Sequence, residues 1–238
     1  MSKLYHLSRL NAPKTWPIKR KEIKWVAKPL PGTHTLYHSM PLSIYLRDIL
    51  GLASINQDIK RLLNKGFVKV NGKIRKELNF SVGLFDVLSL THTNKHYRVA
   101  MTTNGLLNLV EVPASESKLV PVKVNSKTTV SGGKLQVNLN NGWNFLAEKD
   151  SYKVDDVVLF DVEKNKPAKH LKLAEGNVVY VIGGKHVGLF AKLEGLKETG
   201  DLKKKKIAIL KSESETWETP VNQLLVVGEK ESEIKLTK

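Results

Sequence analysis

Cysteine is the most informative absence in this chain of 238 residues. The sequence contains none, which excludes disulfide bonds, cysteine-ligated zinc and thiol nucleophiles. Long apolar runs are missing too, because no stretch approaches the roughly 18 apolar residues of a membrane helix. The start, Met1 to His6, lacks the continuous apolar segment of a secretory signal. We therefore expect a cytoplasmic protein with no membrane anchor.

Acidic residues are scarce relative to basic ones. There are 39 Lys and Arg against 23 Asp and Glu, a formal net charge of +16, whereas the 41% hydrophobic content is ordinary for a folded protein. Such an excess of positive charge repels itself in the free protein, so it indicates a polyanionic partner. Nucleic acid is favoured, and an anionic membrane surface is the alternative.

The positive charge is concentrated near the N-terminus. Residues 1–90 hold 16 basic and 5 acidic side chains, whereas residues 173–238 hold 11 and 10. Within residues 1–40, four prolines and eight basic residues predict an extended basic arm that stays disordered without RNA. Trp16 and Trp25 lie among these bases. They suit either stacking on RNA bases or packing onto a core, and we favour packing.

Residues 41–90 carry the pattern of two helices followed by a hairpin. A capping box of Ser54 and Gln57 predicts the start of the second helix, and Gly66 suits its end. The dipeptide Asn71-Gly72 predicts a tight hairpin turn. The apolar positions at helical spacing are Leu42, Tyr45, Leu46, Ile49 and Leu52 in the first helix, and Ile55, Ile59, Leu62 and Leu63 in the second.

The segment from Ile59 to Leu88 resembles the S-four RNA-binding module of ribosomal proteins, pseudouridine synthases and tyrosyl-tRNA synthetases. Its centre is Gly66-Phe67-Val68-Lys69-Val70-Asn71-Gly72-Lys73, and Asp86-Val87 lies near its end. The resemblance implies docking on helical RNA by shape and backbone contacts. The bases that would form one continuous face are Lys60, Arg61, Lys65, Lys69, Lys73, Arg75 and Lys76.

Residues 91–172 read as short strands separated by turns, which predicts a central domain resembling a β-barrel or sandwich. The expected strands are 97–101, 106–112, 119–124, 135–139 and 157–162.

The run from Glu175 to Leu193 resembles the KOW motif, in which two strands and a glycine turn lie within an SH3-like barrel that contacts RNA or protein. Glycine in the turn permits a positive φ and close approach of a partner. Leu189 stands where many members have a basic residue. The remaining candidates for RNA contact are Lys185, His186 and Lys192.

No arrangement of residues predicts catalysis. His34 and His38 have the spacing of two metal ligands on one helical turn, but no third ligand is near, so we predict no metal site and no cofactor. Asp155 and Asp156 are adjacent, and side chains of adjacent strand residues point to opposite faces. We interpret them as a turn before the strand at 157, and we expect the protein not to be an enzyme.

The order of these parts resembles one family, the archaeal and eukaryotic small-subunit ribosomal protein four (S-four-e). The opening His6-Leu7-Ser8-Arg9-Leu10-Asn11-Ala12-Pro13-Lys14-Thr15-Trp16 carries the resemblance, as do Lys28 to His34 and Pro220 to Gly228. It implies a structural ribosomal protein whose partners are ribosomal RNA and neighbouring ribosomal proteins. The arm residues expected to neutralise phosphates are Arg9, Lys14, Lys19, Arg20, Lys21, Lys24 and Lys28.

The resulting expectation is an α+β multidomain protein. Its parts are the basic N-terminal arm (residues 1–40), the small S-four-like module of two helices and a β-hairpin (41–90), the central barrel-like β domain (91–172) and the SH3-like KOW β-barrel (173–238). The first alternative is an RNA-modifying enzyme of the pseudouridine synthase type, which would need a large catalytic domain with an Asp nucleophile. A KOW-type transcription factor is the second.

Overall fold

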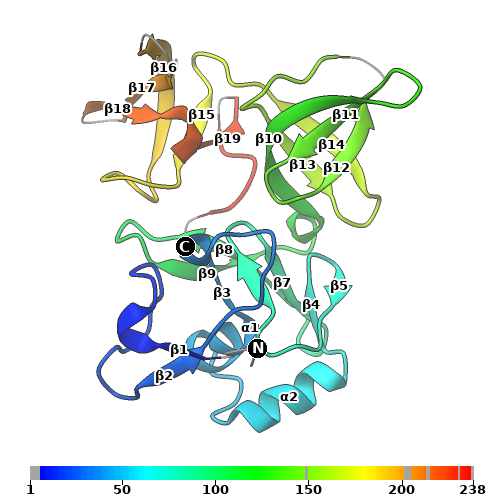
Figure 1. Cartoon of the computed structure of the whole chain (residues 1–238), viewed down its shortest axis with the longest axis vertical. Helices are drawn as coiled ribbons and strands as arrows, with labels where there is room; N and C mark the ends of the chain where they lie inside the picture. The colour runs from blue at the N-terminus through cyan, green and yellow to red at the C-terminus, as the bar shows by residue number, and fades with distance from the viewer. Residues whose placement is uncertain (1–5, 148–149, 201–204, 213–214, 230, 237–238) are drawn as a thin grey trace. The chain divides into compact units, whose positions relative to one another are not determined.

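The computed structural model describes residues 6–147, 150–200, 205–212, 215–229 and 231–236 (Figure 1). The chain forms two compact units, one of Met1–Val120 with Leu236–Lys238 and one of Pro121–Lys235. Strands arranged in several sheets predominate in the described residues, and helical segments are few and short. The α+β expectation therefore holds only in this coarser form, in which sheets dominate.

Unit 1 is built around a five-stranded antiparallel sheet in the order β5-β4-β7-β8-β9. Two smaller pairs, β1 with β2 and β3 with β6, complete its strands. The bounds are β1 His6–Ser8, β2 Trp25–Ala27, β3 Ser39–Pro41, β4 Val68–Val70, β5 Lys73–Ile74, β6 Ser81–Gly83, β7 Val87–Leu90, β8 Lys95–Met101 and β9 Leu107–Val112.

The helical segments of unit 1 bury an apolar stripe. The first helix begins as α1 (Leu42–Ile44) and continues as a π-helical turn, η3 (Tyr45–Ile49). Within this helix Leu42, Ile44, Tyr45 and Leu46 are fully buried. Helix α2 (Asn56–Asn64) buries Ile59 and Leu63. The short 3-10 turns are η1 Arg9–Asn11, η2 Leu36–His38 and η4 Glu116–Lys118.

Two details of the helix prediction are wrong. Helix α2 is capped by Ile55, and no side chain bonds its first backbone N–H groups, so the Ser54–Gln57 capping box does not form. Ile55 is 60% exposed and Leu52 41% exposed, because both lie outside the helices that were expected to bury them. The turn predictions are confirmed, since Asn71 (φ 47°) and Gly72 (φ 72°) have the positive φ values of a tight hairpin turn.

Unit 2 contains two five-stranded antiparallel sheets. The central sheet has the order β12-β11-β10-β13-β14, and the C-terminal sheet has the order β18-β17-β16-β15-β19. The central strands are β10 Leu119–Val130, β11 Lys134–Leu139, β12 Asn144–Ala147, β13 Val157–Asp161 and β14 Lys166–Leu171. The C-terminal strands are β15 Val178–Val181, β16 Phe190–Thr199, β17 Lys205–Lys211, β18 Thr216–Pro220 and β19 Leu224–Gly228, with the 3-10 turn η5 Val221–Gln223 before β19.

The expected boundary at residue 90 is corrected by the sheet of unit 1. Strands β8 and β9 were assigned to the central domain, but β8 pairs with β7 along Val87↔Arg98 to Leu90↔Lys95. The hydrogen-bonded ladder therefore crosses residue 90, and the first unit extends to Val120. The expected boundary at 172 falls between the two sheets of unit 2.

Candidate nucleic-acid interface

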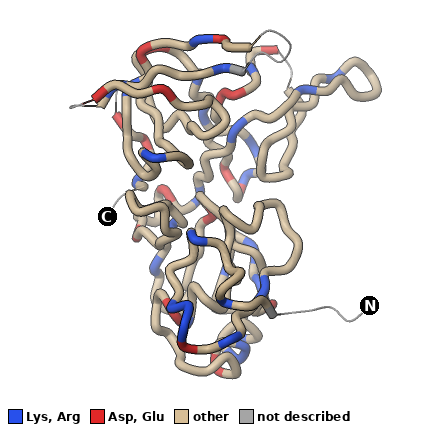
Figure 2. Tube along the Cα trace, turned by 60° about the vertical axis from the view of Figure 1, so that its left-hand side comes forward, with Lys and Arg blue, Asp and Glu red and all other residues tan. Residues whose placement is uncertain are grey.

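The candidate interface is built on helix α2 and the β4–β5 hairpin of unit 1 (Figures 1 and 2). The helix ends in paired hydrogen bonds, from Gly66 N to Leu63 O and from Phe67 N to Leu62 O, with Gly66 at φ 75°. This arrangement ends the helix with one residue in the left-handed backbone conformation, which glycine adopts without a steric penalty because it has no Cβ. The chain then turns directly into β4.

The end of α2 and strand β5 lie against each other. A Cβ placed on Gly66 would be 3.7 Å from two methyl groups of Ile74. Lys69 is opposite Ile74 in the hairpin register, and Lys65 precedes Gly66. Lys69 therefore shares the Ile74 face of the hairpin beside the helix end, whereas Lys73 is opposite Val70 and points to the other face. We call the seven bases of the helix and the hairpin the α2–β5 basic face: Lys60, Arg61, Lys65, Lys69, Lys73, Arg75 and Lys76.

Most bases of this face are accessible. Lys60, Lys65, Lys73 and Lys76 are exposed, and Lys69 is half-buried. Arg61 is also exposed and pairs with Asp58 at 3.1 Å. Arg75 differs, because its guanidinium lies 4.4 Å from the centre of the Phe80 ring. The face thus presents several cations to solvent, while Arg75 also contributes to packing.

The N-terminal segment contains two paired strands and a 3-10 turn, which corrects the expectation of an irregular, extended arm. Strands β1 and β2 pair, and Arg9 is only 7% exposed. The Arg9 guanidinium donates to the carbonyl oxygens of Lys19 (2.6 Å) and Trp25 (3.4 Å). Arg20 donates to the carbonyls of Ala12 and Pro13. These two arginines bind the segment's own backbone carbonyls, so few of their guanidinium N–H groups remain to bind phosphate.

The lysines of this segment remain at the surface. Lys19 pairs with Glu22 at 2.8 Å, and this hydrogen bond raises the pKa of the Lys19 ammonium. The exposed lysines of the segment are Lys14, Lys19, Lys21, Lys24 and Lys28.

The two tryptophans of the segment have different roles. Trp16 is 2% exposed, and its indole N–H donates to the carbonyl of Ser39 at 2.9 Å, so its predicted packing is confirmed. Trp25 is 48% exposed and Lys24 lies over its ring at 5.0 Å, so the packing prediction is wrong for Trp25.

Asp86 organises the hairpin turn, a role that sequence reasoning missed. Its carboxylate accepts hydrogen bonds from Asn71 Nδ2 (2.7 Å) and Gly83 N (2.8 Å), and it contacts His34 Nε2 at 3.2 Å. Burial acts to lower the pKa of His34, but the hydrogen bond and charge of Asp86 outweigh it and raise the pKa. His34 therefore joins residues 31–34 to the module. The sequence feature that could have indicated this role of Asp86 is the Asp86-Val87 pair of the S-four resemblance.

The KOW-like residues lie apart from the α2–β5 basic face in the chain, in unit 2. Lys185 is exposed, and the His186 ring stacks on Trp217 with centroids 4.3 Å apart and planes 13° apart. Lys192 is exposed on β16. The turn thus holds His186 against β18, where stacking covers one side of the ring.

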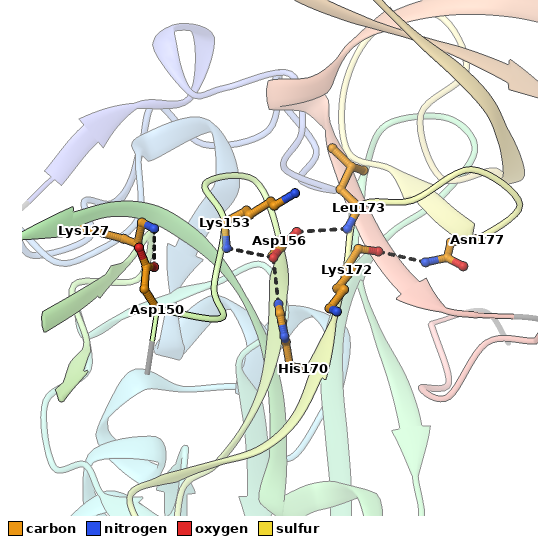
Figure 3. A network of polar contacts seen from close by, with 8 residues as sticks. All are labelled: Lys127, Asp150, Lys153, Asp156, His170, Lys172, Leu173 and Asn177. Atoms are coloured by element: carbon orange, nitrogen blue, oxygen red, sulfur yellow. Dashed lines mark hydrogen bonds and ion pairs between the residues drawn. The ribbon is translucent and has the colours of Figure 1, made fainter. Parts of the chain in front are cut away.

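The adjacent aspartates take structural roles, as the turn interpretation predicted. Asp155 has φ 77° in the turn before β13 and pairs with Lys123 at 3.0 Å. Asp156 accepts from Lys153 N (2.9 Å), Leu173 N (3.0 Å) and His170 Nε2 (2.7 Å), as Figure 3 shows. Each carboxylate is committed to a different set of partners, so the two do not form an acid–base pair.

Within the described ranges, no cluster of three or more His, Asp or Glu side chains is suited to holding a metal ion. The His34 ring lies where a Cβ on Gly83 would stand, beside its contact with Asp86. In the same part of the chain, no helix is both long and apolar enough to cross a membrane.

These features define a class of protein: a β-rich, multi-sheet chain whose accessible basic face suits a polyanion and whose carboxylates are used in structure. Comparisons with known proteins identify the family. The model of Ribosomal family S4e matches residues 93–167, and that of the RS4NT (NUC023) domain matches residues 1–37.

Full-length relatives agree. The small ribosomal subunit protein eS4 of Methanocella arvoryzae is 39% identical over 223 residues, which is 94% of each chain. That of Methanosphaera stadtmanae is 38% identical, covering 97% of this chain and 95% of its own. The crystal structure of the 30S ribosomal protein S4e from Thermoplasma acidophilum matches with a TM-score of 0.69 at 26% identity, covering 81% of this chain and 96% of that one. The chain belongs to the eS4 family, the S-four-e family of the sequence resemblance.

Proposed function

We propose that this protein is a structural component of the small ribosomal subunit that binds ribosomal RNA and supports translation. The observation that carries the proposal is membership of the eS4 family over nearly the whole chain, at 39% identity to a curated small-subunit protein. Its place is at the ribosome. Because the family is a ribosomal one, the protein is not an enzyme, and no feature favours the pseudouridine synthase alternative.

The physical basis of RNA binding in this proposal is the α2–β5 basic face together with the N-terminal lysines. Exposed ammonium and guanidinium groups neutralise phosphates and release counterions, which provides affinity without reading sequence. The face forms on a short helix and a tight hairpin held by packing, so its charges are positioned before RNA arrives. The residues that we propose contact RNA here are Lys14, Lys19, Lys21, Lys24, Lys28, Lys60, Arg61, Lys65, Lys69, Lys73 and Lys76.

In unit 2, Lys185 and Lys192 extend the proposed contact set, with His186 as a weaker member because its ring is stacked on Trp217. We propose that other parts of the surface of unit 2 contact neighbouring ribosomal proteins.

The decisive experiment is sedimentation of a lysate through sucrose gradients at low and high salt, with this protein followed by immunoblot. We expect co-migration with small subunits that survives high salt, because an integral component is held by packing as well as by salt-sensitive phosphate contacts. Absence from the ribosomal fractions at both salt concentrations would overturn the proposal.

A further inference from the structure

A cavity of about 560 Å³ opens on the C-terminal sheet of unit 2. Its volume lies within the range of roughly 300–1,000 Å³ that is usual for small-ligand sites. The lining residues are Val178, Phe190, Ala191, Lys192, Lys211 and Ser212. The proposed function assigns Lys192 to RNA contact, and it gives no role to the other lining residues.

The strand register places four of these side chains on one face of the sheet. Val178 on β15 is opposite Lys192 on β16, and Lys192 is opposite Lys211 on β17. Phe190 lies two residues before Lys192, so it shares the same face. Its ring is half-buried and packs against the buried Tyr180 at a centroid distance of 5.3 Å. The cavity therefore has an apolar, partly aromatic wall beside two cations.

Lys192 and Lys211 are directly opposite each other on neighbouring strands. Like charges directly opposite each other on neighbouring strands destabilise the pairing. Glu194 compensates Lys211 at 3.2 Å, but Lys192 forms no ion pair with any residue that the structure describes. An anionic group between the two ammonium groups would remove this repulsion.

We infer that this cavity receives one unpaired nucleotide of RNA, with its base against Phe190 and its phosphate between Lys192 and Lys211. The inference rests on the proposed ribosomal function and names a specific contact within it. Proteins recognise single-stranded RNA by stacking splayed bases on aromatic rings and neutralising the adjacent phosphate. Ser212 also lines the cavity, and its hydroxyl supplies a hydrogen-bonding group for the sugar or base. An acidic protein segment would satisfy the lysines but would leave the aromatic wall without a stacking partner.

The role of Lys192 and Lys211 is tested by measuring binding of the full-length protein to a fluorescein-labelled, unstructured oligouridylate. An RNA duplex of the same length serves for comparison. The double variant Lys192→Gln/Lys211→Gln should bind the single strand about tenfold or more weakly, with a much smaller loss on the duplex. Phe190→Leu keeps apolar bulk but removes the ring, so it should cost roughly tenfold on the single strand only.

The matched control is Lys197→Gln/Lys206→Gln, which removes one lysine from each of the same two strands outside the cavity. Equal losses in this control and in the cavity variant would overturn the inference, because they would indicate general electrostatics. Circular dichroism of each variant verifies that the sheet is retained.

The occupant is identified by replacing Phe190 with photoreactive p-benzoylphenylalanine in the full chain and irradiating assembled small subunits. A crosslink to RNA supports the inference, and a crosslink to a ribosomal protein overturns it. The two proposals fail in different ways. If the unaltered protein sediments with small subunits while the cavity variants match their control, only the nucleotide site is wrong. If the unaltered protein is absent from small subunits, the ribosomal function itself is wrong.

Discussion

The two units of this protein contain similar numbers of basic residues but different numbers of acidic residues. Residues 1–120 hold 19 basic and 7 acidic side chains, whereas residues 121–238 hold 20 and 16. Lysines of the second stretch often have a carboxylate beside them, as in Lys169–Glu233 and Lys197–Glu218. Net charge, rather than the number of lysines, therefore distinguishes a surface suited to phosphate from one that stays close to neutral.

Both units also contain a buried cation. Arg98 in unit 1 is fully buried, and its guanidinium donates to the carbonyls of Glu116 (2.9 Å) and Leu119 (2.8 Å). Lys123 in unit 2 is 8% exposed and donates to the carbonyl of Val221 at 2.7 Å. Both cations donate to main-chain oxygens, so positive charge in this protein also stabilises the fold.

The largest effect should come from removing charge in unit 1. We expect the variant Lys60→Gln/Arg61→Gln/Lys65→Gln/Lys73→Gln to bind ribosomal RNA on the order of 10³-fold more weakly near physiological salt. The slope of log affinity against log salt should fall by about 3 to 4, because each lost phosphate contact removes close to one released counterion. Filter binding across a salt series measures both quantities.

The matched control for that variant removes four exposed lysines of unit 2: Lys134, Lys164, Lys166 and Lys172. A smaller loss is expected there. An equal change in slope would show that phosphate contacts are distributed over both units, and the contrast drawn from net charge would not hold.

Arg98→Met should destabilise unit 1 by about 3 kcal/mol, because it leaves buried carbonyls and the Glu116 carboxylate without their donor. Burial lowers the pKa of Arg98 to about 10, against the opposing effect of Glu116, so the residue is still charged at neutral pH. Hydrogen exchange followed by mass spectrometry should localise the loss to unit 1. The control Arg47→Met removes a surface pair with Asp48 and should cost under about 1 kcal/mol.

Lys123→Met should destabilise unit 2 by about 2 kcal/mol, less than Arg98→Met does in unit 1. Of the two carbonyl oxygens that Lys123 contacts, that of Val221 is at 2.7 Å but that of Leu224 is at 3.5 Å, whereas the two carbonyls bound by Arg98 are at 2.9 and 2.8 Å. Urea unfolding, with hydrogen exchange to assign the unit, measures the difference. Lys127→Met, on the same strand but paired with exposed Asp150, should change the unfolding free energy by less than about 1 kcal/mol. Loss of protection in unit 1 instead would contradict the assignment of Lys123 to the core of unit 2.

The smallest effect concerns His34 in unit 1. Its pKa is raised above the ordinary value of 6.5 by Asp86, against the effect of burial, so the folded state holds the proton more tightly than the unfolded state. The resulting stabilisation is complete below pH 6.5 and is lost as the pH rises through the folded-state pKa. The pKa of His38 is lowered, chiefly by burial. Protonation of His38 at acid pH therefore lowers the free energy of unfolding, which opposes the effect of His34.

Urea unfolding of the protein and of His34→Gln between pH 5 and 8 tests this linkage. The difference in unfolding free energy should be larger at pH 5.5 than at pH 8, by under about 1 kcal/mol. The exposed His92→Gln variant is the control. A difference that is independent of pH would mean that His34 contributes packing against Gly83 alone.

Local chemistry made much of this protein predictable. Asn71-Gly72 formed its turn and Gly66 ended its helix because both depend on backbone conformations that few other residues adopt. The five strands predicted between residues 97 and 162 were found because short apolar runs separated by turn residues are typical of strands. Strand β12 and the second half of β10 were not predicted. The exposed bases of α2 were found because they fall outside the apolar stripe of that helix.

What the sequence by itself determined is the set of short elements, the excess of positive charge in the first part of the chain and the family resemblance. Only the tertiary structure decided that β8 and β9 join the first sheet, that Arg9 is buried while Trp25 is exposed, and that Asp86 holds the hairpin turn. It alone placed Phe190, Lys192 and Lys211 around one cavity. The reason is physical: turns and caps are set by neighbours along the chain, whereas sheet order, burial and ion pairs depend on residues brought together from distant positions.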